Sequence, residues 1–203
     1  IRMSGVELRD ADGDDLRRHV GLLSQRAHVF DTTIADNVRI GAPDADDETV
    51  AQALDRARLT DWVRSLPDGV DTVVGSFGVG VSGGEGQRIA LARLLVAGRR
   101  FVVLDEPTEH LDAPTADALT DTLAEVLRET TVVTITHRLL GLEHADRIVV
   151  LDGGRIVGQG THDELMSAGG WYAQQWRLEA ERLDLAVLLP GLPLGRAVPG
   201  PAA

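Results

Sequence analysis

Two adjacent carboxylates, Asp105 and Glu106, directly follow the apolar run formed by residues 101–104. Four apolar residues in a row predict a buried strand of a parallel sheet, and α/β proteins bind ligands at the carboxyl edge of such a sheet. One carboxylate at that edge can hold Mg²⁺, usually through water, and the next can orient an attacking water as a general base. The alternative is a strand that simply ends in an acidic turn.

Three small residues, Ser82, Gly83 and Gly84, stand at the start of a run that is apolar nearly all round, residues 84–97. That composition predicts a buried helix, and Ser82 is a suitable N-cap for it. Glycines allow the backbone to come close to a ligand, and a helix N-terminus offers free N–H groups and partial positive charge. The pattern therefore predicts a phosphate-binding device that uses no Lys. The alternative is an ordinary flexible loop with a cap.

Both groups need a sheet and helices to position them. Residues 131–136, rich in Val, Ile and Thr, predict a second buried parallel strand, and residues 114–128 predict a helix between the two strands. Residues 20–23 predict a further strand that leads to Gln25. The remaining predicted elements are helices over residues 47–59 and 172–183, a capping box over 161–164 and a hairpin over 147–151 and 155–157. This order of elements is typical of the α/β class.

Composition narrows the possible functions. The 203 residues suffice for one domain with a sizeable core, and the net charge of −12 argues against nucleic-acid binding. The absence of Cys excludes disulfides and cysteine-based metal sites. All 20 basic residues are Arg, and because a P-loop uses its Lys on the terminal phosphates, these residues contain no P-loop. Neither a signal peptide nor an apolar run of about 20 residues occurs, and the opening without Met predicts a fragment of a longer protein.

Five motifs occur along the chain in a recognisable order. They are Gln25 after a predicted strand, Ser82-Gly83-Gly84-Glu85, Asp105-Glu106, Leu111-Asp112, and His137 after another predicted strand. In these motifs and their separations, residues 5–183 resemble the ATP-binding-cassette (ABC) ATPase family. The resemblance implies an α/β nucleotide-binding domain with a RecA-like P-loop core, a mostly parallel sheet and a helical subdomain at about residues 36–98 that carries the signature motif. It also implies ATP and Mg²⁺ as cofactors.

The resemblance assigns four residues to this chain's own ATP site. Gln25 looks like the Q-loop glutamine, which contacts Mg²⁺ and the attacking water and senses the transmembrane domain. Asp105 resembles the Walker B aspartate, a metal ligand, and Glu106 resembles the catalytic base. His137 resembles the switch histidine that contacts the γ-phosphate.

Five further residues would serve a site shared with a second subunit. Ser82, Gly83, Gly84 and Glu85 look like the signature motif, which closes over ATP held by the partner. Asp112 resembles the D-loop aspartate at the seam between the two domains. The resemblance therefore implies a dimer of nucleotide-binding domains arranged head to tail.

Other residues point to one branch of the family. Residues 30–37 and 67–75 resemble the exporter type, in which the first segment meets the coupling helices of the transmembrane domain. Glu109-His110, where most ABC proteins have small residues, is similar to the CydC subunits of heterodimeric cysteine/glutathione exporters needed for cytochrome bd assembly. This implies a CydD-like second half-transporter and a place on the cytoplasmic face of the bacterial inner membrane. Gly86 and Ser76 depart from the family pattern.

The resemblance also predicts the organisation of the chain. Residues 1–183 would form the ABC ATPase domain without its Walker A segment, and the Pro- and Leu-rich residues 184–203 are predicted to be a disordered tail. We expect the missing strand to lie next to strand 101–104, so that its loss exposes a sheet edge. Without a P-loop, this chain alone is expected neither to bind ATP tightly nor to hydrolyse it. The alternatives are a soluble non-transport ABC ATPase and a non-catalytic fragment.

Overall fold

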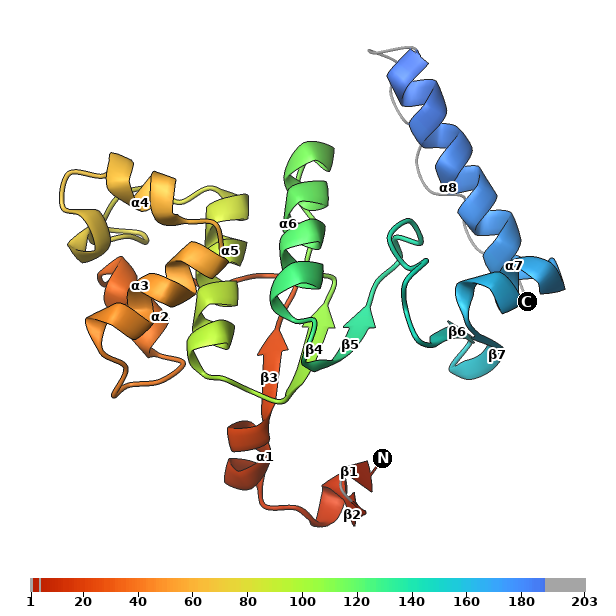
Figure 1. Cartoon of the computed structure of the whole chain (residues 1–203), viewed down its shortest axis with the longest axis horizontal. Helices are drawn as coiled ribbons and strands as arrows, with labels where there is room; N and C mark the ends of the chain where they lie inside the picture. The colour runs from red at the N-terminus through yellow and green to blue at the C-terminus, as the bar shows by residue number, and fades with distance from the viewer. Residues whose placement is uncertain (1, 4, 189–203) are drawn as a thin grey trace. The chain divides into compact units, whose positions relative to one another are not determined.

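The computed structural model describes residues 2–3 and 5–188, which divide into two units between Thr136 and His137. The first contains the predicted parallel sheet, formed by β3 (Val20–Leu23), β4 (Phe101–Asp105) and β5 (Thr131–Ile135) in the order β3-β4-β5 (Figure 1). Both pairings are parallel, and α6 (Ala113–Val126) connects β4 to β5. The predicted strand–helix–strand unit is confirmed.

The β5 strand differs from its prediction. We expected it to be buried, but Val133 is 56 % exposed and Ile135 is 51 % exposed. Among the described strands, β4 is the one that pairs with β5, so one edge of β5 has no strand beside it. The expectation of a missing strand next to β4 is therefore wrong, because β3 and β5 already occupy both edges of β4.

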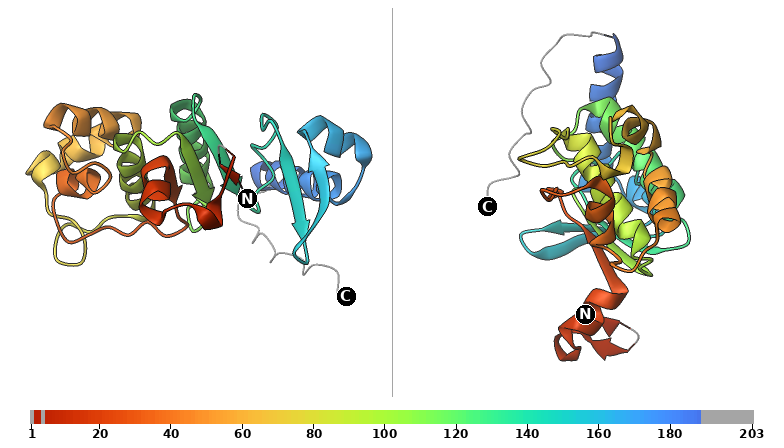
Figure 2. Two further views of the ribbon diagram at one scale, coloured as in Figure 1. Left: turned by 90° about the horizontal axis from the view of Figure 1, so that it is seen from below. Right: turned by 90° about the vertical axis from the view of Figure 1, so that its left-hand side faces the viewer.

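A helical group lies beside this sheet and is joined to it through one long helix (Figures 1 and 2). The helix is α5 (Gly83–Val96), which packs against α2 (Ile34–Arg39), α3 (Asp47–Arg56) and β3. Ile89 and Leu91 of α5 are fully buried in the core, as its apolar composition predicted. The same core contains Leu23 of β3 and Leu119 of α6, so it fixes the helices and the sheet to one another.

The predicted helix over residues 47–59 is shorter in the structure. It ends early as α3, and α4 (Thr60–Ser65) follows after a break at Arg58, whose φ is +57°. A left-handed residue cannot continue a right-handed helix. The helix α4 lies beyond the predicted range and was not predicted. The shorter elements of this unit are β1 (Arg2–Met3), β2 (Val6–Glu7), η1 (Leu8–Asp10), α1 (Gly13–His19) and η2 (Gly69–Asp71).

The second unit contains the predicted hairpin, formed by β6 (Ile148–Asp152) and β7 (Arg155–Gly160). The predicted capping box begins α7 (His162–Ala168), and Leu165 of that helix packs with Tyr172 in a small core. The last helix, α8 (Trp171–Leu188), continues past the predicted end at 183, so residues 184–188 are helical and not a disordered tail. Residues 189–203 of the predicted tail lie outside the described residues.

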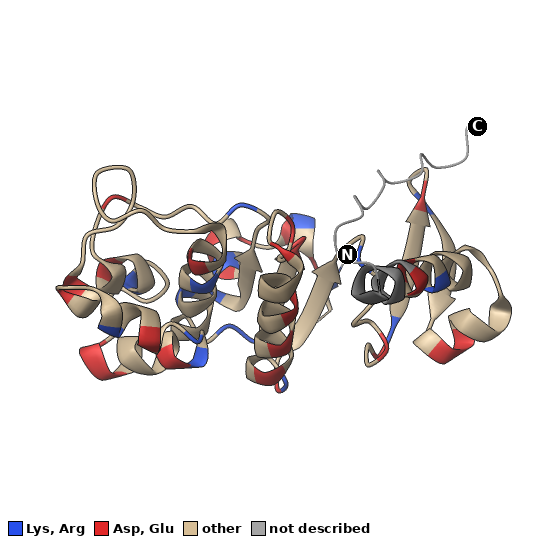
Figure 3. Cartoon of the chain, turned by 90° about the horizontal axis from the view of Figure 1, so that it is seen from above, with Lys and Arg blue, Asp and Glu red and all other residues tan. Residues whose placement is uncertain are grey.

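Among the described residues, no helix combines the length and the apolar character that crossing a membrane requires. Figure 3 shows the charges, with acidic residues prominent on α6 and on the helical group.

Candidate functional site

The carboxyl ends of β3 and β4 lie side by side. Leu23 is paired with Leu104 in parallel register, and Gln25 and Glu106 each follow two residues later. The side chains of Gln25, Asp105 and Glu106 are half-buried. The structure thus brings the predicted Q-loop glutamine to the same sheet edge as the predicted pair of carboxylates.

A fourth side chain at this edge was not assigned a role from the sequence. Gln25 donates a hydrogen bond through Nε2 to a carboxylate oxygen of Glu109. The carboxylate oxygens of Glu106 and Glu109 offer atoms within 4.8 Å of one another. The sequence had marked Glu109 as unusual for the family, yet a contact across 84 positions of the chain leaves no local signal.

The turn after β4 holds these carboxylates in a constrained backbone. Glu106 has φ of +47° and His110 has φ of +66°, both in the left-handed region that residues other than glycine seldom adopt. The turn is held by two hydrogen bonds, from the Glu106 N–H to the Ile135 carbonyl at 2.9 Å and from the Glu109 N–H to the Glu106 carbonyl at 3.1 Å. Such strained backbone is typical of functional sites, where the surrounding structure maintains it.

The donor atoms at this edge fit Mg²⁺. Asp105 and Glu106 offer carboxylate oxygens and Gln25 offers an amide oxygen, the hard oxygen ligands that Mg²⁺ prefers. The fourth residue predicted for this site, His137, is exposed and is the first residue of the second unit, two residues after the end of β5.

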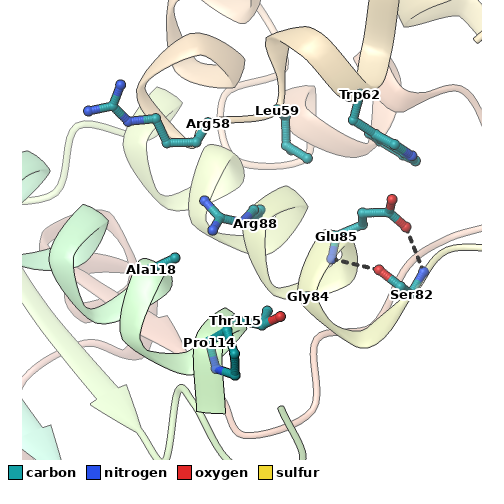
Figure 4. Close-up of a pocket in the computed structure, with 10 residues that line it drawn as sticks. All are labelled: Arg58, Leu59, Trp62, Ser82, Gly84, Glu85, Arg88, Pro114, Thr115 and Ala118. Carbon is teal, nitrogen blue, oxygen red and sulfur yellow. Dashed lines mark hydrogen bonds between the residues drawn. The ribbon is translucent and has the colours of Figure 1, made fainter. Parts of the chain in front are cut away.

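The predicted signature residues lie at the start of α5. The Ser82 Oγ accepts a hydrogen bond from the Glu85 N–H at 3.3 Å, and the Glu85 carboxylate accepts one from the Ser82 N–H at 2.7 Å (dashed in Figure 4). This capping box confirms Ser82 as the N-cap and gives Glu85 a structural role. The capping box does not use the N–H groups of Gly83 and Gly84. As N–H groups of the first helical turn, they have no hydrogen-bond partner within the helix.

Gly84 also has a packing role. A Cβ atom there would lie 2.8 Å from the Cγ2 of Thr115, so glycine allows α5 to approach the start of α6. The predicted D-loop residue Asp112 caps α6, accepting hydrogen bonds from the Thr115 N–H at 3.1 Å and the Thr115 hydroxyl at 2.7 Å. These bonds from Thr115 hold the pKa of Asp112 below its usual value. The predicted signature and D-loop residues are thereby brought to neighbouring helix starts.

A hollow of about 370 Å³ adjoins these helix starts. Ser82, Glu85 and Thr115 border it on one side, and Arg58 and Arg88 line it on another, as Figure 4 shows. Burial lowers the pKa of Arg88, and the nearby positive charge of Arg58 lowers it further. The two guanidinium groups at this hollow are balanced in part, because Arg58 pairs with Glu125 at 2.7 Å and the Glu85 carboxylate borders the same hollow.

One buried face of α5 reaches the segment that follows β3. The Gln87 amide donates to the Gln25 carbonyl at 2.7 Å. Arg93 donates to the carbonyl of His28 at 2.8 Å and to both the carbonyl and the side-chain oxygen of Asn37 at 2.7 and 2.6 Å. Burial lowers the pKa of Arg93. This network was not predicted from the sequence, because Gln and Arg in a helix are more often on its solvated face.

The comparisons with known proteins agree with this architecture. Residues 1–109 match the family described as "ABC transporter". The match covers more than half of the chain, and the chain therefore belongs to the ABC transporter family. The predicted ABC ATPase fold is confirmed by a solved structure, that of a bacterial Atm1-family ABC exporter with ATP bound. It aligns with a TM-score of 0.78 at 36 % identity and covers 87 % of this chain and 31 % of that one.

Two relatives show how the similarity is distributed. The chain is 43 % identical over 182 residues to the glutathione/L-cysteine transport system ATP-binding/permease protein CydD of Bacillus subtilis (strain 168), covering 88 % of this chain and 31 % of the relative. It is 42 % identical over 180 residues to the ATP-dependent lipid A-core flippase of Bordetella avium (strain 197N), covering 88 % and 30 %. The chain thus spans about a third of the length of these relatives.

Proposed function

We propose that this chain is part of the ATP-hydrolysing motor domain of an ABC exporter half-transporter. The observation that carries the proposal is the register of the parallel sheet, which puts Gln25 and Glu106 at one edge with Asp105. In this proposal Asp105 and Gln25 hold the Mg²⁺ of bound ATP, and Glu106 accepts a proton from the attacking water as the general base. His137 contacts the γ-phosphate. Bound Mg²⁺ neutralises charge that develops on the phosphates.

The signature residues would act on a second nucleotide, held by a partner domain in a head-to-tail dimer. The capping box occupies the N–H groups of Ser82 and Glu85, so those of Gly83 and Gly84 are left for the partner's phosphate. Asp112, at the neighbouring start of α6, would lie at the seam of the dimer.

The finer proposal is a CydC-like subunit of a heterodimeric cysteine/glutathione exporter for cytochrome bd assembly, paired with a CydD-like subunit. Glu109-His110 supports the CydC-like assignment. The 43 % identity to a CydD protein, whose name includes glutathione and L-cysteine transport, supports the exporter system and not CydC in particular. This motor would work at the cytoplasmic face of the bacterial inner membrane against the coupling helices of a transmembrane domain. An exporter of another cargo is the second candidate, because identity to the lipid A-core flippase is nearly as high. Uptake of cysteine and of lipid A by inverted membrane vesicles distinguishes the two.

The central test replaces Glu106 by Gln in the whole transporter. Glu106→Gln keeps the size of the side chain but removes the base, so hydrolysis at this site is expected to fall by about 10²–10⁴-fold while ATP binding persists. Steady-state ATPase activity and binding of labelled ATP measure the two quantities. Glu129→Gln, an exposed change directly before β5 at the opposite sheet edge, is the matched control. Wild-type turnover by Glu106→Gln would refute the assignment.

A further inference from the structure

The hydrogen bond between Gln25 and Glu109 has a chemical direction. A primary amide is nearly symmetric in shape, and a half-turn about its last bond exchanges its oxygen and nitrogen. An ionised carboxylate accepts hydrogen bonds and has none to donate, so the partner that faces it must be the amide nitrogen. Contact with Glu109 therefore turns the Oε1 atom of Gln25 away from the Glu109 carboxylate.

Glu109 is itself held in place. It belongs to the turn that is flanked by the left-handed residues Glu106 and His110, and its own N–H donates to the Glu106 carbonyl. The turn is fixed to the sheet by the bond from the Glu106 N–H to the Ile135 carbonyl. The Glu109 side chain is half-buried, and partial removal from water strengthens its hydrogen bond to Gln25.

We propose that Glu109 is a positioning residue that fixes the amide of Gln25 so that its Oε1 is presented to the Mg²⁺ of bound ATP. This inference rests on the proposed function, because it takes Gln25 as a ligand of that ion. Partners that orient a metal ligand typically contribute 10–100-fold to metal affinity. Glu109 gives this chain such a partner at a position where most of the family has a small residue.

The test measures metal binding and does not depend on turnover. Mn²⁺ replaces Mg²⁺ as an oxygen-preferring probe, and its binding to the whole transporter with saturating ATP is followed by electron paramagnetic resonance, in the non-hydrolysing Glu106→Gln background. Glu109→Ala and Gln25→Ala are each expected to weaken Mn²⁺ binding by about 10-fold. If Glu109 acts through Gln25, the double variant binds Mn²⁺ no more weakly than the weaker single variant.

Two further variants complete the design. Glu109→Gln keeps the size of the side chain but can donate as well as accept, so it no longer dictates the amide orientation, and we expect intermediate Mn²⁺ binding. Glu129→Ala removes an exposed carboxylate from the opposite edge of the sheet and is expected to leave Mn²⁺ binding unchanged. If Glu109→Ala does not fold, Glu109→Gln is compared instead with the Gln25→Ala/Glu109→Gln double variant.

The outcomes separate this inference from the proposed function. Unchanged Mn²⁺ binding in Glu109→Ala overturns the inference alone. So does a Gln25→Ala/Glu109→Ala double variant whose fold-loss of Mn²⁺ affinity equals the product of the two single fold-losses, because Glu109 would then act by its own charge and not through Gln25. A parent transporter that binds no Mn²⁺ with ATP overturns both the inference and the proposed function.

Discussion

Replacing Arg93 by methionine removes a charged hydrogen-bond donor that links α5 to the segment following Gln25. Arg93 makes three hydrogen bonds of 2.6 to 2.8 Å, to the His28 carbonyl and to two oxygens of Asn37, and its guanidinium lies 5.2 Å from the centre of the Phe30 ring. Asn37 is fully buried, and its side chain also bonds the backbone of Phe30 at 2.9 and 3.0 Å. Methionine keeps most of the apolar stem and none of the donors, so the variant isolates the polar network.

The expected loss of stability in Arg93→Met can be worked out from these hydrogen bonds. A hydrogen bond that involves a charged group contributes about 1.5–3 kcal/mol, and three such bonds set the upper limit. Arg93 is half-buried, so water can reach some of the acceptors that it leaves. We therefore expect Arg93→Met to lower the free energy of unfolding by about 3–5 kcal/mol. In a domain of this size each kcal/mol lowers the midpoint by about 2–4 °C, so the melting temperature falls by about 10 °C.

The assay is thermal unfolding of the ATPase domain within the purified transporter, followed by near-ultraviolet circular dichroism. Arg99→Met is the matched control, because Arg99 makes a single hydrogen bond, of 2.6 Å, to the Arg18 carbonyl near the same helix end. Its expected cost is about 1.5 kcal/mol, the lower end of the range for a charged hydrogen bond, because this bond is exposed. Equal melting temperatures for the two variants would refute the argument that the Arg93 network fixes the segment after Gln25.

Three more properties can be tested: the head-to-tail dimer, the loss of stability at acid pH, and ATP binding by this chain alone. In the whole transporter, Ser82→Arg is expected to abolish nucleotide trapping at the site held by the partner, and photo-crosslinking with unchanged partner labelling would contradict the head-to-tail arrangement. Hydrogen bonds from the Thr49 hydroxyl and N–H lower the pKa of Asp46, the N-cap of α3. The contribution of ionised Asp46 to the stability of the fold is therefore fully present above the ordinary carboxyl pKa of 3.8, and it is lost as the pH falls through the lowered pKa. Asp46→Asn should accordingly be less stable than wild type at pH 7 and equal to it in strong acid, and a constant difference across an acid titration would contradict this. The 203-residue chain, which has no Lys and a charge of −12, should show no micromolar binding of Mg-ATP by isothermal titration.

The sequence predicted best those elements whose signals are local. The start of α5 was predicted because Ser82 is a suitable N-cap before an apolar run, and the structure adds Glu85 as the second half of a capping box. The sheet edge was predicted because an apolar run followed by Asp105 is a strand with a polar end. The end of α3 was predicted three residues too late, because the residue type at Arg58 does not indicate a left-handed backbone.

What the sequence did not predict depends on the register of distant segments. Glu109 meets Gln25 only because β3 and β4 are paired in one particular alignment, and Gly84 meets Thr115 only because α5 and α6 pack closely. The exposure of β5 was missed for a related reason, since burial of a strand is decided by its neighbours and not by its own Val and Ile residues.

The order of the strands along the chain also determines how long each strand stays unpaired during synthesis. β3 leaves the ribosome first, but its neighbour β4 follows only about 80 residues later, whereas β5 follows β4 after about 25. At about 5–20 residues per second, β3 waits about 4–16 s for its partner, longer than any other strand of this sheet. A pause in translation after β3 has emerged and before β4 has emerged prolongs the exposure of an unpaired strand to aggregation, whereas a pause after all three strands have emerged does not.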